Sequence, residues 1–204
     1  MEARKTWARV GTRSLAVACT LVGLAVLVSF IGLVSGTAGS LGSSTSIHGQ
    51  TWASVGLILV ILSVGGFALA RTESGVWHAE RDLNVGLGLG GLAALFALIG
   101  LILFHAAGAA RAATSGPTWT GFGTVWGFAA LGWLLFTRPL DRARAMTAAT
   151  ISGGIALLFT VIGLALGLGD SFTDVLHSQG WLGAATVAAI LATGAALGIR
   201  RDPL

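Results

Sequence analysis

Six long apolar runs constrain the fold of this chain more than any other feature of its sequence. They cover residues of about 14–36, 51–70, 84–108, 119–137, 145–168 and 181–199. A helix rises about 1.5 Å per residue, so roughly 20 residues are needed to cross a hydrocarbon core of about 30 Å. An open segment in lipid satisfies its backbone only as a helix. The runs therefore predict an all-α membrane protein with six transmembrane helices.

The placement of charge predicts the direction of these helices. Only 10% of the residues are charged, against roughly 25% in a soluble domain, and the net charge is +4. Every basic residue except Arg111 lies before the first run, in the second or fourth connection, or after the sixth run. Basic residues favour the cytoplasmic side. We therefore expect a multi-pass protein of the cytoplasmic membrane with both termini in the cytoplasm, whose charge serves orientation and not nucleic-acid binding.

An internal repeat organises the six runs into three hairpins. Each even-numbered run has a Trp near its start, a Gly 13 residues later and an Arg 19 residues later: Trp52, Gly65 and Arg71; Trp119, Gly132 and Arg138; Trp181, Gly194 and Arg200. Each odd-numbered run has an Arg followed 19 residues later by the Gly of an Ile-Gly-Leu triplet: Gly32, Gly100 and Gly163. The repeat predicts one integral membrane domain, 1–204, built from hairpins at about 13–71, 81–138 and 144–200.

The repeated residues have physical roles in a bilayer. Trp prefers the headgroup level and Arg can extend its charge to the interface, so we expect interface anchors at Trp52, Trp119, Trp181, Arg71, Arg138 and Arg200. Small residues let transmembrane helices approach closely. We therefore expect helix packing at Gly32, Gly36, Gly65, Gly100, Gly132, Gly163, Gly167 and Gly194, where Gly32 with Gly36 and Gly163 with Gly167 form GxxxG pairs.

Three of the four histidines are predicted to lie at one side of the membrane. His48 and His177 each precede an outer Trp by four residues. His105 lies 24 residues after Arg81, which is roughly 36 Å of helix and reaches the outer interface. Imidazole is a common ligand for zinc and copper, so His48, His105 and His177 are candidate metal ligands. The alternative is that they hydrogen-bond to loop backbone; their titration between pH 5 and 8 would also allow acid sensing.

No constellation in the sequence predicts catalysis. No nucleophile–base pair, paired carboxylates, phosphate-binding loop or zinc-protease motif is present, and the "GLGLGG" stretch lies in an apolar run with no strand before it. No Asp, Glu, Lys or Arg falls within the six runs, whereas such residues mark proton and ion pathways in membranes. We expect no enzyme activity, and the sequence names no cofactor-binding residue.

The architecture and the glycine placement, as in "VGLILVILSVGG", resemble the HdeD-like acid-resistance membrane protein family. The stretches "GLVSGTAGS" and "GLALGLGD" lack the Pro that members carry just after the odd-numbered helices, and the loop before His48 is longer. The resemblance implies a stress-associated prokaryotic inner-membrane protein and no catalytic residues.

Three functions are compatible with this sequence. The first is a non-enzymatic membrane protein that acts through packing, as a stress-type membrane component or as an accessory subunit that binds other membrane subunits or itself. The second is a channel or carrier for a small neutral solute. The third is a haem, pigment or metal binder at the outer face.

Overall fold

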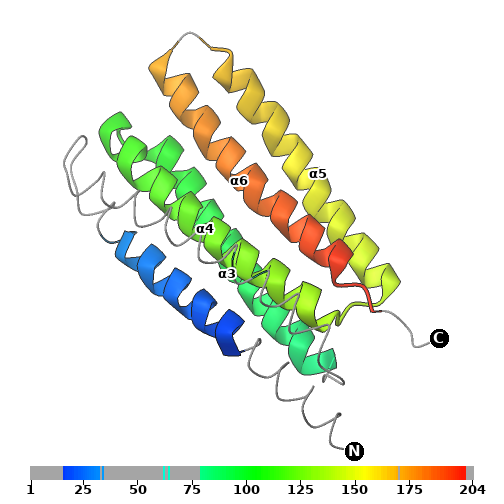
Figure 1. Ribbon diagram of the computed structural model, residues 1–204. Coiled ribbons are helices and arrows are strands. Elements are labelled where there is room, and N and C mark those ends of the chain that lie inside the picture. Colours follow the sequence, from blue (N-terminus) through cyan, green and yellow to red (C-terminus); the bar gives the residue numbers. More distant parts are fainter. Residues whose placement is uncertain are drawn as a thin grey trace, which may run out of the picture.

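The computed structural model of the chain describes residues 16–32, 34, 62, 64, 79–169 and 171–200. Four long helices form this part: α3 (Ala79–Ala106), α4 (Ala109–Thr137), α5 (Arg142–Gly167) and α6 (Phe172–Leu197). A shorter apolar helix, Ala16–Gly32, lies beside them (Figure 1). The four long helices are long and apolar enough to cross a membrane, so the prediction of an all-helical protein suited to a bilayer is confirmed.

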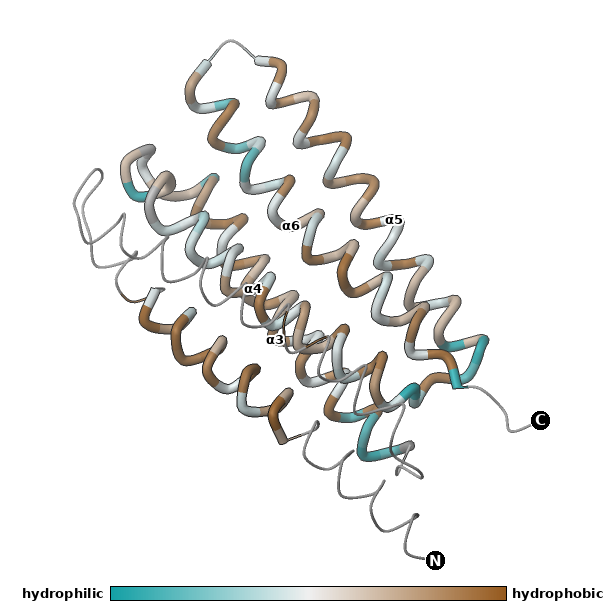
Figure 2. The backbone as a smooth tube through the Cα atoms, in the orientation of Figure 1, coloured by the Kyte–Doolittle hydropathy of each residue, from teal (hydrophilic) through white to brown (hydrophobic). Residues whose placement is uncertain are grey.

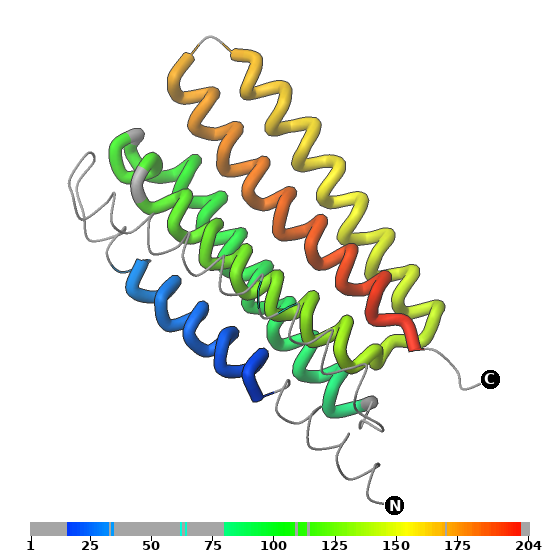
Figure 3. Tube along the Cα trace, in the orientation of Figure 1, coloured from blue at the N-terminus to red at the C-terminus, as the bar shows by residue number. Residues whose placement is uncertain are grey.

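The four long helices run antiparallel to their neighbours in sequence. α3 packs against α4 and α5 against α6, while α6 also contacts α4 and α3 (Figure 1). We call the end where α3 ends and α6 begins the histidine end, and the opposite end the arginine end. The helix Ala16–Gly32 packs on α4 through Ala18 against Phe136 and through Ala25 against Val125 and Ala129. α4 therefore lies inside the bundle and α5 at its edge (Figure 3).

Two of these helices are longer than the apolar runs predicted. α4 begins at Ala109 and α6 at Phe172, about ten residues before Trp119 and Trp181, in stretches predicted to be loops. The added turns contain small and polar residues, which a hydropathy pattern excludes but which helices accommodate. Ser171 caps α6 by accepting a hydrogen bond from the backbone of Asp174 at 3.0 Å. The connections from α3 to α4 and from α5 to α6 are accordingly very short.

Close glycine contacts bring α3, α4 and α6 together. A Cβ on Gly123 would lie 3.0 Å from both Ala93 O and Ala97 N, so the backbones of α4 and α3 nearly touch there. The ring of Phe104 fits between Gly116 of α4 and Gly180 of α6, where an added Cβ would come within 2.7 Å of its atoms. Phe104 is 1% exposed. This side chain fixes the end of α3 against two other helices.

Backbone hydrogen bonds connect three helices at the arginine end. Arg138 ends α4 in a left-handed conformation, with φ of 45°, and Asp141 caps α5 through the backbone N–H of Arg144 at 2.8 Å. Between them, Leu140 donates to Gly198 O at 3.1 Å and accepts from the backbone N–H of Arg200 at 2.6 Å. The connection between α4 and α5 is thereby joined to the chain that follows α6.

Hydrophobic residues occupy most of the length of the helices, and hydrophilic residues gather near the ends (Figure 2). Leu87 of α3 and Leu157 of α5 are 64% and 71% exposed. A soluble bundle would place such residues inside, whereas lipid accepts them outside. The outer surface of the described helices is that of a membrane protein.

Candidate functional site

Two of the three predicted outer histidines meet at the histidine end. The rings of His105, at the end of α3, and His177, in the second turn of α6, are stacked with centroids 4.2 Å apart and an interplanar angle of 17°. Trp181, one turn after His177, donates its indole N–H to His105 Nε2 at 2.9 Å. The third predicted histidine, His48, lies outside the described residues.

Hydrogen bonds assign a role to each ring nitrogen of His105. Its Nε2 accepts from Trp181 and therefore carries no proton. Its Nδ1 lies 2.9 Å from Leu101 O, which is an acceptor only, so Nδ1 carries the proton and donates. Both ring nitrogens of His105 are thus used in hydrogen bonds. Acid sensing by the predicted outer histidines stays a prediction.

His177 is the member of the pair whose ring nitrogens remain available for a ligand. It is half-buried, and its ring nitrogens make no hydrogen bond with any residue that the structure describes. Its position follows from the α6 cap at Ser171 and from Phe104, which precedes His105 and holds α3 against Gly180 of α6. One imidazole is thus a fixed support, and the other offers a donor and an acceptor.

Metal binding by His48, His105 and His177 stays a prediction. Across the described helices, no three His, Cys, Asp or Glu side chains are grouped so as to hold an ion. His105 and His177 face each other ring to ring, and a metal would have to replace one of the two hydrogen bonds of His105. The geometry brings two candidate ligands together without aiming their nitrogens at one point.

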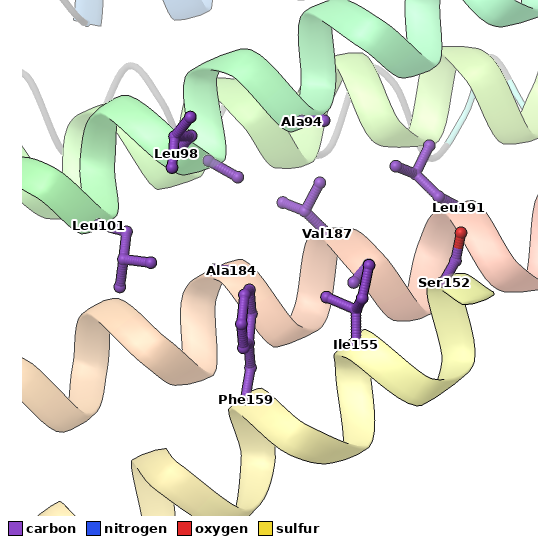
Figure 4. Close-up of a pocket in the computed structure, with 11 residues that line it drawn as sticks. Ala94, Leu98, Leu101, Ser152, Ile155, Phe159, Ala184, Val187 and Leu191 are labelled. Atoms are coloured by element: carbon purple, nitrogen blue, oxygen red, sulfur yellow. The ribbon is translucent and has the colours of Figure 1, made fainter.

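A cavity of about 290 Å³ lies between α3, α5 and α6 (Figure 4). We call this cavity the slot. Its walls are alanines and larger apolar side chains, and Ser152 is its one hydroxyl-bearing lining residue. Because α3 and α5 do not contact each other, α6 forms the floor between them. Phe159 lines the slot and packs edge-on against Trp181, with centroids 4.9 Å apart. Trp181 thus contacts both a residue that lines the slot and the histidine pair.

A buried carboxyl group at the arginine end was missed by the sequence analysis. Asp82 is 0% exposed, and neither of its carboxyl oxygens has a hydrogen-bond partner among the described residues. A guanidinium nitrogen of Arg81 lies 3.5 Å from it, and Trp133 donates its indole N–H to the backbone oxygen of Asp82 at 3.0 Å. Asp82 lies just before the third apolar run. In a sequence, an acid next to an Arg at such a position indicates a solvent-exposed helix end.

Four of the predicted packing glycines lie against a neighbouring helix. A Cβ on Gly100 would meet Thr120 at 2.6 Å, one on Gly163 would meet Leu182 at 2.8 Å, and one on Gly167 would meet Ser178 at 2.8 Å. Gly194 lies against Leu131 of α4, with a corresponding distance of 3.3 Å, and Gly32 and Gly132 are buried. Gly36 and Gly65 lie outside the described residues.

The predicted anchors have more varied surroundings. Trp119 lies ten residues into α4 and packs on Phe96, with ring centroids 5.5 Å apart. Trp181 belongs to the histidine pair, Arg138 forms the left-handed end of α4, and Arg200 joins the backbone of Leu140. Trp52 and Arg71 lie outside the described residues.

Comparison with models of known protein families, with curated proteins and with solved structures finds no match to this chain.

Proposed function

We propose that the chain is a non-enzymatic, multi-pass protein of the cytoplasmic membrane that acts as an accessory subunit by binding another membrane protein. In this proposal six helices cross the bilayer as three hairpins, with both termini in the cytoplasm. The distribution of arginines supports the direction, and the four long apolar helices support the crossing. A fluorescent protein fused after Leu204 should fold and fluoresce, whereas a periplasmic reporter at the same position should be inactive.

The edge position of α5 is the observation that carries this proposal. Only Ala145, Ala156 and Gly163 of its 26 residues are buried, and α6 is its one neighbour among the four long helices. One face of α5 is both apolar and exposed, with large side chains at steps of three, four or more residues: Met146, Leu157, Val161, Leu164 and Leu168. We call this the far face of α5.

Gly153 gives the far face a shape suited to a helix. No heavy atom lies within 4 Å of the position that its Cβ would take, and the same is true of Gly154. Among the residues that the structure describes, these glycines make no close contact, unlike Gly163 on the same helix. A glycine on an apolar face lets the backbone of a second helix approach closely. The far face therefore fits a transmembrane helix of another subunit.

Cross-linking in native membranes tests this proposal. In a Cys19→Ser background, Leu157→Cys places the only thiol on the far face, and Leu87→Cys is a matched control on an exposed position of α3. We expect a discrete adduct from Leu157→Cys alone, with a mass that identifies either a foreign subunit or a second copy. A foreign adduct supports the accessory role, and a doubled mass assigns the face to self-association. Equal labelling of both positions, or no adduct, contradicts it.

A second candidate function, an outer-face ligand binder, is favoured by the stacked histidine pair with the free nitrogens of His177. An absorbance spectrum and metal analysis of the purified protein test it. The channel or carrier hypothesis has less support, because the slot is lined almost entirely by apolar groups. Solute flux into liposomes tests that hypothesis.

The proposed stress role rests on the resemblance to the HdeD-like family. Survival of a deletion strain after acid exposure, compared with the complemented strain, tests it. Equal survival of both strains would remove this part of the proposal and leave the binding role untouched.

A further inference from the structure

The histidine pair and the residues that line the slot lie on one face of α3 and on one face of α6. On α3, residues at steps of four, three and four lead from the slot to the pair: Ala94, Leu98, Leu101 and His105. On α6 the steps are four, three, four and three: His177, Trp181, Ala184, Ala188 and Leu191. Such steps place residues on one face of a helix. The histidine pair therefore lies on the same helix faces as the walls of the slot, toward the histidine end.

The combined feature is amphiphilic along its length. The slot itself is lined by apolar side chains from three helices. At the histidine end, the feature has the ring nitrogens of His177. An apolar cavity of this kind does not hold ordered water, which needs polar partners. The cavity volume of about 290 Å³ and the almost wholly apolar lining suit a single hydrocarbon chain.

The dimensions match one leaflet of a bilayer. From Ala94 to His105 there are 11 residues, or about 16 Å of helix rise. Half of a hydrocarbon core of about 30 Å is roughly 15 Å. With the histidine pair at the interface, the bottom of the slot reaches the middle of the membrane. Leu98 and Ile155, both exposed at the edges of the slot, leave a lateral way in from the lipid.

We propose that the slot binds one acyl chain of a membrane phospholipid, whose ester or phosphate oxygens accept a hydrogen bond from a ring N–H of His177. His105 acts as a positioning residue, because both of its nitrogens are used and its ring supports that of His177. Trp181 and Phe159 contact the upper part of the chain. The proposal rests on membrane insertion of the helices but not on the partner proposed for the far face of α5.

Photolabelling with a defined lipid tests the proposal. The full chain is reconstituted into vesicles of palmitoyl-oleoyl phosphatidylcholine, a small fraction of which carries a diazirine at the end of one acyl chain. Labelled peptides are then identified by mass spectrometry. We expect labelling concentrated on the slot walls near Ala94, Ser152 and Leu191, where the chain end would lie. Labelling spread evenly over the exposed faces of α3 and α5 would overturn the proposal.

Three variants separate a built site from ordinary boundary lipid. Ala94→Phe, at an exposed position that points into the slot (Figure 4), should reduce slot labelling to background. His177→Phe keeps the ring stack and removes the nitrogens, so slot labelling should fall about fivefold, as for a lost hydrogen bond. Leu157→Phe, on the far face of α5, is the matched control and should leave slot labelling unchanged.

The outcomes are read together with the thermal unfolding of each variant in detergent. If Ala94→Phe unfolds like the wild type but is labelled equally in the slot, the slot holds no chain and the proposal fails. If His177→Phe alone leaves labelling unchanged, the headgroup contact is wrong. Neither result alters the Leu157→Cys adduct, so failure here is distinguishable from failure of the proposed subunit contact.

Discussion

α4 and α5 are both long apolar helices, yet they occupy opposite kinds of position. In its most apolar stretch 56% of α4 is buried, against 11% of α5. α4 has the lower mean hydropathy of the two. This order is the reverse of that in soluble proteins, because lipid already provides an apolar surrounding for Leu and Ile. Glycines, hydroxyl groups and alanines instead gather where helices touch. In this protein the less hydrophobic helix is the central one.

The largest effect should come from Phe104, which fills the space between Gly116 of α4 and Gly180 of α6. Phe104→Ala leaves a cavity, and we expect a loss of about 3–5 kcal/mol of unfolding free energy. Leu157→Ala, at an exposed position on α5, should change stability by less than about 0.5 kcal/mol. Unfolding in detergent followed by circular dichroism measures both. Equal losses would erase the distinction between centre and edge.

The same substitution, Gly→Ala, tests the comparison between α4 and α5 at one position in each helix. Gly123→Ala in α4 meets backbone atoms of α3 at 3.0 Å and should cost about 1–3 kcal/mol. Gly153→Ala in α5 meets nothing within 4 Å and should stabilise the helix by up to about 1 kcal/mol. The two variants should therefore move the apparent melting temperature in opposite directions. A decrease for Gly153→Ala would mean that α5 is more enclosed than this bundle implies.

One side-chain hydrogen bond joins the edge helix to its neighbour. Ser178 of α6 donates to Gly163 O of α5 at 2.7 Å, and both residues are buried. Ser178→Ala should cost about 0.6–1.7 kcal/mol, as measured for such bonds in membranes. Thr186→Ala is the matched control, since the Thr186 hydroxyl bonds within its own helix and is exposed. A smaller effect at Ser178 than at Thr186 would show that glycine packing alone holds α5.

The smallest expected effect concerns Trp181. His105→Phe keeps a ring against His177 but removes the acceptor of the indole N–H, so the fluorescence of Trp181 should shift with little change in melting temperature. The shift is isolated by subtracting the spectrum of a Trp181→Phe variant. His177→Phe should leave the emission of Trp181 nearly unchanged, because His177 makes no hydrogen bond to it. Identical spectra for His105→Phe and the wild type would contradict the hydrogen bond.

Local patterns predicted much of this fold. Apolar runs located α3 and α5 to within a few residues, and helix rise alone placed His105 at the same end as His177. Hydropathy could not find the first turns of α4 and α6, since small and polar residues there serve helix contacts. It also could not predict which helix is central or that Asp82 would be buried. The stacking of His105 on His177 depends on Phe104 and two glycines far apart in sequence, a relation that no local pattern contains.

The backbone link at Leu140 has a mechanical consequence. It joins the end of α4, the start of α5 and the chain after α6 through two hydrogen bonds at the arginine end. At the opposite end, the described contacts between α6 and the α3–α4 pair are made by side chains, chiefly Phe104, His105 and Trp181. Side chains can change rotamer, whereas paired backbone cannot. The α5–α6 hairpin is therefore fastened to the end of α4 through backbone at the arginine end, so a side-chain substitution at the histidine end leaves that attachment in place.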